Sequence, residues 1–133
     1  MQILLDTHVF LWLQAEPERL GHHLPLVEDP RNDRLVSAAS SWEIAIKVAI
    51  GRLSLPEPPA RWVAARLGSI GATALPIEHA HALAVAELPL HHRDPFDRLL
   101  VAQSRLLDVP LLTADRQLGR YDVEVLLIEG RPA

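Results

Sequence analysis

Four acidic residues follow or flank short apolar stretches in this 133-residue chain, and this pattern constrains the fold more than any other feature. In a parallel α/β sheet every strand points the same way, so residues at the carboxyl ends of the strands gather along one edge. We therefore expect the four carboxylates to converge there. They are Asp6 after residues 2–5, Glu43 just past 34–37, Asp97 at the opening of a helix at 95–107, and Asp115 after 110–113.

The rest of the chain alternates apolar strand patterns with helical ones, which predicts an α/β fold with a parallel sheet and helices on both faces. The length fits one domain, and no linker or repeat interrupts residues 1–133, so we predict a single domain. The predicted strands are 2–5, 34–37, 73–76, 110–113 and 123–128. The predicted helices are 7–14, 17–20, 23–29, 41–50, 59–69, 78–87, 95–107 and 116–119.

Four carboxylates on one edge repel each other unless a cation neutralises them. Oxygen-only ligation suits a hard ion such as Mg²⁺ or Mn²⁺. The acids therefore predict a metal-dependent hydrolase that acts on phosphate esters.

Each acid also has a purely structural explanation, because acids are enriched at helix starts. Asp6 and Asp115 would cap the segments that follow them, and Glu43 lies three residues after Ser40, the spacing of a capping box. Asp97 lies near the positive end of its own helix. Capping does not require all four acids to lie beside strand ends, and that joint placement favours a site.

Several polar residues lie next to the acids and are candidate substrate-binding residues. Thr7, Ser40 and Thr113 are placed to hold a metal-bound water or a phosphate, and helix capping is the alternative. Arg93 and Arg98 flank the third acid and could steer a polyanion, with surface solvation as the alternative.

Other residues receive structural interpretations. Lys47 lies four residues after Glu43, which predicts a pair on one helix face. His91 and His92 lack a zinc-binding spacing, so they are predicted to be loop or rim residues. Three tryptophans in apolar helical patterns are predicted to be core residues: Trp12, Trp42 and Trp62.

Composition limits the remaining classes of function. The chain has no cysteine, which excludes disulfides and thiolate zinc sites and favours a cytoplasmic location. We expect no signal peptide and no membrane segment, because no apolar run approaches the ~20 residues of a membrane helix. The net charge of −4 argues against non-specific nucleic-acid binding. Twelve of the thirteen basic residues are arginine, however, so a local phosphate-binding rim is still compatible with the composition.

Four segments together resemble the PIN-domain nucleases, and most closely the VapC-type toxins of bacterial toxin–antitoxin pairs. They are LLDTHVFLW, SAASSWEIAIKVAIGRLSL, LPLHHRDPFDRLLVAQS and LLTAD, which occur in this order along nearly the whole chain. The resemblance implies a three-layer α/β/α sandwich and a Mg²⁺- or Mn²⁺-dependent endoribonuclease. It also implies a VapB-like antitoxin partner and a homodimer.

By position, Asp6, Glu43, Asp97 and Asp115 match the family's catalytic acidic quartet, and Thr113 matches its hydroxyl residue. We predict Asp6, Asp97 and Asp115 as metal ligands, with Asp6 and Asp97 the best candidates for direct contact. Glu43 and Asp115 bind directly, bind through water, or orient the attacking water. Asp94, the other acid of the DPFD segment, is predicted to cap a helix, and further rim residues are Arg52 and Arg116.

Two other classes remain to be separated from a nuclease. A phosphoaspartate phosphatase would use Asp6 as its nucleophile, but it needs a second aspartate two residues later, where this chain has His8. A receiver-like or antitoxin-binding scaffold would use the acids only to hold a structural metal. For an antitoxin, the predicted groove combines Leu11 and Trp12 with the helix at 41–50.

Overall fold

The computed structural model of the chain describes residues 1–129, and it contains a five-stranded sheet in the order β3-β2-β1-β4-β5. Every neighbouring pair of strands is parallel, as the sequence predicts. The strands are β1 (Gln2–Leu5), β2 (Asp33–Ser37), β3 (Thr73–Leu75), β4 (Leu111–Thr113) and β5 (Val125–Leu127). Residues 130–133 lie outside the described residues, and a single domain over 1–133 stays a prediction.

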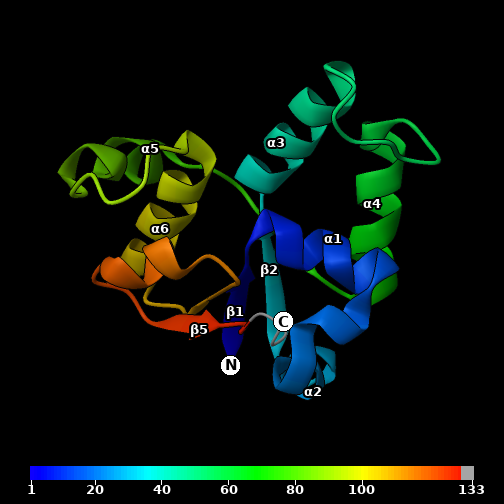
Figure 1. The fold of residues 1–133 in the computed structure, drawn as a ribbon, viewed down its shortest axis with the longest axis horizontal. Helices are drawn as coiled ribbons and strands as arrows, with labels where there is room; N and C mark the ends of the chain where they lie inside the picture. The colour runs from blue at the N-terminus through cyan, green and yellow to red at the C-terminus, as the bar shows by residue number, and fades with distance from the viewer. Residues whose placement is uncertain (130–133) are drawn as a thin grey trace.

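Six α-helices and three 3₁₀ segments occur in residues 1–129, and they cover both faces of the sheet. Figure 1 shows α5 and α6 on one side of the strands and α1 and α4 on the other. The α-helices are α1 (Thr7–Ala15), α2 (Leu24–Glu28), α3 (Ala38–Ala49), α4 (Pro59–Ile70), α5 (His79–Ala84) and α6 (Pro95–Leu107). The 3₁₀ segments are η1 (Pro17–His23), η2 (Val85–Glu87) and η3 (Arg116–Arg120).

The two faces follow from the alternation of side chains along each strand. Leu4 and Leu111 point into one core, which α5 and α6 help to close. Ile3, Leu5 and Leu112 point into the other core, with residues of α1, α2 and α4. The fold is therefore a three-layer α/β/α sandwich, as the resemblance implies. Within residues 1–129, the helices are too short or too polar to cross a bilayer.

Helix α3 begins three residues earlier than the sequence pattern suggests. The Ser37 hydroxyl oxygen accepts a 3.0 Å hydrogen bond from the Ala39 amide and caps the helix. Ser40 therefore lies inside the helix, and the capping box that was the alternative explanation for Glu43 does not form. Within this helix Glu43 is only 5% exposed, whereas its neighbour Trp42 is 57% exposed.

The core prediction for Trp42 is therefore wrong. It is confirmed for Trp12 and Trp62, which pack partly buried against the core that contains Phe10. The ring of Trp42 instead lies on the surface against Phe96, with the ring centroids 5.0 Å apart.

The strand order places a topological switch point beside the central strand. The chain runs outward from β1 to β2 and β3, and then returns to β4 on the other side of β1. Ligands of open α/β sheets bind at the carboxyl ends of the strands next to such a point. Asp6 follows β1 and Asp115 follows β4 closely, so the switch point brings these two acids to one crevice.

Candidate active site

The four predicted acids converge at the carboxyl edge of the sheet. The pKa of Asp97 is raised to about 8, first by burial and then by the charges of neighbouring acids. Three of these acids, Asp6, Glu43 and Asp115, come from other elements of the fold. Their mutual repulsion is the electrostatic condition that a cation would relieve.

Asp6 is only 3% exposed and is fixed by the strands beside it. Its amide donates to the Leu112 carbonyl at 3.0 Å, and its Oδ2 accepts a 2.5 Å hydrogen bond from the Thr113 hydroxyl. Its Oδ1 is buried and has no hydrogen-bond partner, and the side chain does not cap α1. Burial raises the pKa of Asp6, and the hydrogen bond from Thr113 partly opposes this.

Glu43 projects from α3 and is 5% exposed. Its Oε2 lies 2.8 Å from the Lys47 ammonium, which confirms the predicted pair on one helix face. Its Oε1 is buried without a partner, like Oδ1 of Asp6. An unpartnered buried carboxylate oxygen is costly, so these two atoms are the ones that a cation or donor bound at this edge would satisfy.

Asp97 lies in the first turn of α6 but does not cap it. Oδ1 of Asp94 accepts hydrogen bonds from the Phe96 and Asp97 amides at 2.8 and 3.2 Å, so Asp94 is the cap, as predicted. Because Asp94 caps the helix, the Asp97 carboxylate, which is 16% exposed, is free to face the other acids.

Asp115 serves both as a turn residue and as part of the cluster. Its Oδ1 accepts from the Gln117 amide at 2.9 Å, and its own amide donates to the Thr113 hydroxyl oxygen at 3.0 Å. Thr113 therefore connects Asp6 to Asp115 through a single hydroxyl. The other carboxylate oxygen of Asp115, Oδ2, faces the cluster.

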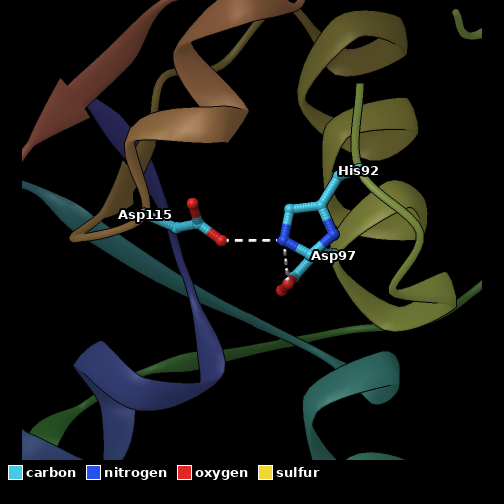
Figure 2. Close-up of side chains that lie close together, drawn as sticks. All are labelled: His92, Asp97 and Asp115. Carbon is cyan, nitrogen blue, oxygen red and sulfur yellow. Dashed lines mark hydrogen bonds and ion pairs between the residues drawn. The ribbon is translucent and has the colours of Figure 1, made fainter. Parts of the chain in front are cut away.

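His92 is the residue of this site that the sequence prediction missed. Its ring lies between the carboxylates of Asp97 and Asp115 in Figure 2. The Nε2 atom is 2.8 Å from Asp115 Oδ2 and 3.4 Å from Asp97 Oδ2. The prediction of a loop or rim residue is confirmed in that His92 lies in the irregular segment before α6, but it did not include the contacts with the two acids. Half-buried His91 lies against Tyr121. The position of His92, just before the DPFD segment, was the available signal.

The structure gives the predicted substrate-binding hydroxyls internal partners. The Thr7 hydroxyl donates to Ser40 Oγ at 2.8 Å, and both residues are buried, so this bond joins α1 to α3. Thr113 is buried as well. Their contact with substrate stays a prediction.

The two predicted arginines differ in their surroundings. Arg93 is exposed beside the cluster. Arg98 is half-buried, and its two terminal nitrogens donate to four backbone carbonyls and to the Tyr121 hydroxyl. The observed role of Arg98 is therefore to hold the segment before α6, and its contact with substrate stays a prediction. Arg52 and Arg116 are exposed.

The residues of the cluster fit a hard divalent cation. Carboxylate oxygens dominate the donor set, and the buried atoms without partners, Asp6 Oδ1 and Glu43 Oε1, are the oxygens that such an ion would satisfy. One potential ligand atom from each of His92, Asp97 and Asp115 also lies within 4.8 Å of the other two.

Comparisons with known proteins agree with this geometry. The family model described as "PIN domain" matches residues 3–124. The chain is 32% identical over 122 residues to "Ribonuclease VapC22" of Mycobacterium tuberculosis, and the alignment covers 90% of this chain and 91% of that protein. It is 48% identical over 56 residues to "Ribonuclease VapC16" of the same organism, which spans 42% of this chain and 40% of that protein.

A solved structure supports the fold independently. The chain is similar to one in the crystal structure of VapBC2 from Rickettsia felis bound to a DNA fragment from their promoter, with a TM-score of 0.73. The match covers 97% of this chain and 100% of that chain at 13% sequence identity. At this identity the likeness concerns the fold alone.

Proposed function

The chain belongs to the PIN-domain family, and we propose that it is a Mg²⁺- or Mn²⁺-dependent endoribonuclease, the toxin of a toxin–antitoxin pair. The observation that carries the proposal is the pair of buried carboxylate oxygens without partners, on Asp6 and Glu43, at an edge where Asp97 already has a pKa of about 8. The similarity to proteins named ribonuclease VapC supports RNA as the substrate.

In this proposal Asp6, Asp97 and Asp115 hold the metal. When bound, the ion would supply a water of lowered pKa and offset negative charge on the phosphodiester as it is attacked. Glu43 keeps one oxygen on Lys47 and has its second free to contact the metal or to orient the attacking water. Thr113 fixes the two aspartates that come from β1 and β4.

The substrate is proposed to approach along the exposed side of this edge. Arg93, Arg52 and Arg116 are exposed. In this proposal they contact backbone phosphates, whereas Arg98 supports the wall of the site. Such contacts predict binding to RNA that weakens with added salt. The proposed setting is the cytoplasm, where cellular RNA is found.

The proposal is tested by cleavage of single-stranded RNA with and without divalent metal. We expect cleavage with Mg²⁺ or Mn²⁺, no cleavage with a chelator, and loss of cleavage in Asp6→Asn, which keeps the size of the side chain. Metal binding without cleavage by the wild-type protein would contradict the proposal and favour a scaffold with a structural ion. Mapping the cleaved ends in cellular RNA then defines the target.

The proposed partner is a small VapB-like antitoxin, and the structural similarity to a VapBC complex supports it. Trp42 and Ile46 of α3, and Ile50 directly after it, lie at i, i+4 and i+8 and are 57%, 38% and 59% exposed. The same helix carries Glu43. An apolar helix of the antitoxin is proposed to cover this stripe, and the predicted groove that adds Leu11 and Trp12 stays a prediction.

Expression tests this partnership. The chain alone should arrest growth, and a small protein encoded beside it should restore growth and co-purify. We also propose that the protein is a homodimer. The mass of the protein in solution tests this, and a monomer mass would contradict it. A chain that is harmless alone and shows no ribonuclease activity would count against the toxin proposal.

A further inference from the structure

The hydrogen bonds of His92 assign its proton. Nδ1 of the ring accepts a 3.0 Å hydrogen bond from the backbone amide of Asp94. A backbone amide can only donate, so this ring nitrogen carries no proton, and the neutral ring has its proton on Nε2. Nε2 is the atom that faces Asp115 at 2.8 Å and Asp97 at 3.4 Å. A protonated Nε2 donates to a carboxylate and has no lone pair for a metal.

The backbone that carries the ring is held from two sides. The His92 amide donates to the Tyr121 hydroxyl oxygen at 2.9 Å. The Arg98 guanidinium donates to the His92 carbonyl at 3.4 Å and to the Tyr121 hydroxyl at 3.2 Å. A bare Nε2 would require the proton on Nδ1, and that proton would face the Asp94 amide, so two donors would oppose each other.

An N–H donor between like-charged carboxylates is useful before a cation arrives. The side chain of Asp115 is 35% exposed, and the bond to His92 restrains the oxygen that is not used in the turn. Donors of this kind fix the orientation of ligand side chains in metal sites, and their loss typically lowers metal affinity or activity about 10- to 100-fold.

We propose that His92 is a positioning residue: its Nε2–H holds Asp115, and more weakly Asp97, in the orientation that receives the metal, while the imidazole stays outside the ligand set. For the metal, this inference rests on the proposed function. The hydrogen bonds themselves concern the metal-free protein, so two separate experiments address the two parts.

The first experiment determines the tautomer without metal. Long-range proton–nitrogen NMR of protein with ¹⁵N-labelled histidine distinguishes a ring protonated on Nε2 from one protonated on Nδ1. The His92 signals are identified by their absence from His92→Gln. We expect the Nε2–H form. A ring with its proton on Nδ1 would overturn the inference, whatever the fate of the proposed function.

The second experiment uses Mn²⁺ as the probe, with protein that carries no histidine tag. Pulsed EPR of the Mn²⁺-loaded wild-type protein should show no coupling to a directly bound imidazole nitrogen. By calorimetry, His92→Ala should bind Mn²⁺ about 10- to 100-fold more weakly. His92→Gln, which can still donate from its own Nε2, should recover most of the affinity. Melting of each variant without metal checks the fold.

The matched control is His91→Ala, because the neighbouring ring packs on Tyr121 and not on the carboxylates. Its Mn²⁺ affinity should equal that of the wild-type protein. Coupling to a bound imidazole nitrogen that disappears in His92→Gln, or unchanged affinity in His92→Ala, would overturn the positioning role. Failure of the proposed function is distinguishable, because it is measured by RNA cleavage and not by Mn²⁺ affinity. A wild-type protein that binds no Mn²⁺ would overturn the positioning role as well, while the NMR result would stand.

Discussion

Polar groups at the two ends of the sheet differ in whether their buried atoms have hydrogen-bond partners. At the amino end, Asn32 accepts from the N-terminal ammonium at 3.0 Å and donates to a backbone carbonyl at 2.9 Å. Arg34 there donates to three backbone carbonyls, and only its Nε lacks a partner. At the carboxyl end, Asp6 and Glu43 each bury a carboxylate oxygen that no donor reaches.

Two aspartates at these ends make the difference concrete. Hydrogen bonds from Arg31 lower the pKa of Asp29 at the amino end. Burial and neighbouring acids raise the pKa of Asp97 at the carboxyl end to about 8. The charged group at the amino end is thus stabilised by a hydrogen-bond partner within the protein. At the carboxyl end the acids repel each other, and protons or a cation would relieve that repulsion. This contrast indicates which end binds a ligand.

The largest expected effect comes from removing one charge at the carboxyl end. Asp6→Asn and Asp97→Asn should each lower the rate of RNA cleavage by more than about 100-fold, the upper range for residues that merely surround the ligands of a metal. Each change preserves side-chain size and removes a charged ligand. The measurement is single-turnover cleavage of a labelled RNA at saturating Mn²⁺.

The matched control is Asp29→Asn at the amino end, the same chemical change on an aspartate that already has a partner. It should cleave RNA at the wild-type rate. Wild-type activity in Asp97→Asn would remove that residue from the metal site, and an equal loss in Asp29→Asn would erase the contrast between the two ends.

The second prediction concerns stability and pH. Because the folded-state pKa of Asp97 lies at about 8, above its ordinary 3.8, the metal-free protein takes up a proton on folding between these values. Its free energy of unfolding should therefore fall as the pH rises from about 5.5 toward 8, at up to about 1.4 kcal/mol per pH unit for one such group. The raised pKa of Asp6 acts in the same direction.

Mn²⁺ should reverse this trend, because it binds the ionised acids of the folded state alone. Urea unfolding at pH 6 and pH 8, with Mn²⁺ and with chelator, measures both effects. The stabilisation by Mn²⁺ should be larger at pH 8. Asp97→Asn should flatten the metal-free pH dependence, whereas an unchanged slope in that variant would assign the dependence to other groups.

The sequence predicts the acidic quartet because its position follows from a general rule. Parallel strands end at one edge, and the apolar runs before Asp6 and Asp115 are plain in the sequence. The roles within the DPFD segment also follow from local chemistry, since Asp94 precedes the proline at the first helical position and caps the helix, leaving Asp97 free. These inferences need no long-range contacts.

The errors come from information that local pattern does not contain. The apolar helical pattern around Trp42 predicts a core residue, but that pattern does not tell which face of α3 packs inward, and Trp42 is 57% exposed. The contacts of His92 depend on how the irregular segment before α6 folds, through the amide of Asp94 and the hydroxyl of Tyr121. Spacing along the chain cannot predict those contacts.

The third prediction concerns Thr113, which connects the two central acids. Thr113→Val keeps the shape and removes the hydroxyl that donates to Asp6 and accepts from the Asp115 amide. RNA cleavage should fall about 10- to 100-fold, the usual range for groups that orient metal ligands. Thr113→Ser, which keeps the hydroxyl, should retain most of the activity. Equal rates in the valine and serine variants would show that the link is dispensable.

The smallest expected effect lies at the amino end and separates stability from function. Asn32→Ala removes two hydrogen bonds, from the N-terminal ammonium and to the Leu26 carbonyl, and should lower the free energy of unfolding by about 1–2 kcal/mol. The ammonium is near solvent and can be rehydrated, so the loss should not exceed this range.

Urea unfolding at pH 8 with Mn²⁺ gives the stability, and single-turnover cleavage gives the rate. Because Asn32 lies at the opposite end of the sheet from Asp6, the rate and the Mn²⁺ affinity should equal those of the wild-type protein. A fall in Mn²⁺ affinity would mean that the two ends are coupled, and the division of the sheet into a stabilising end and a ligand-binding end would fail.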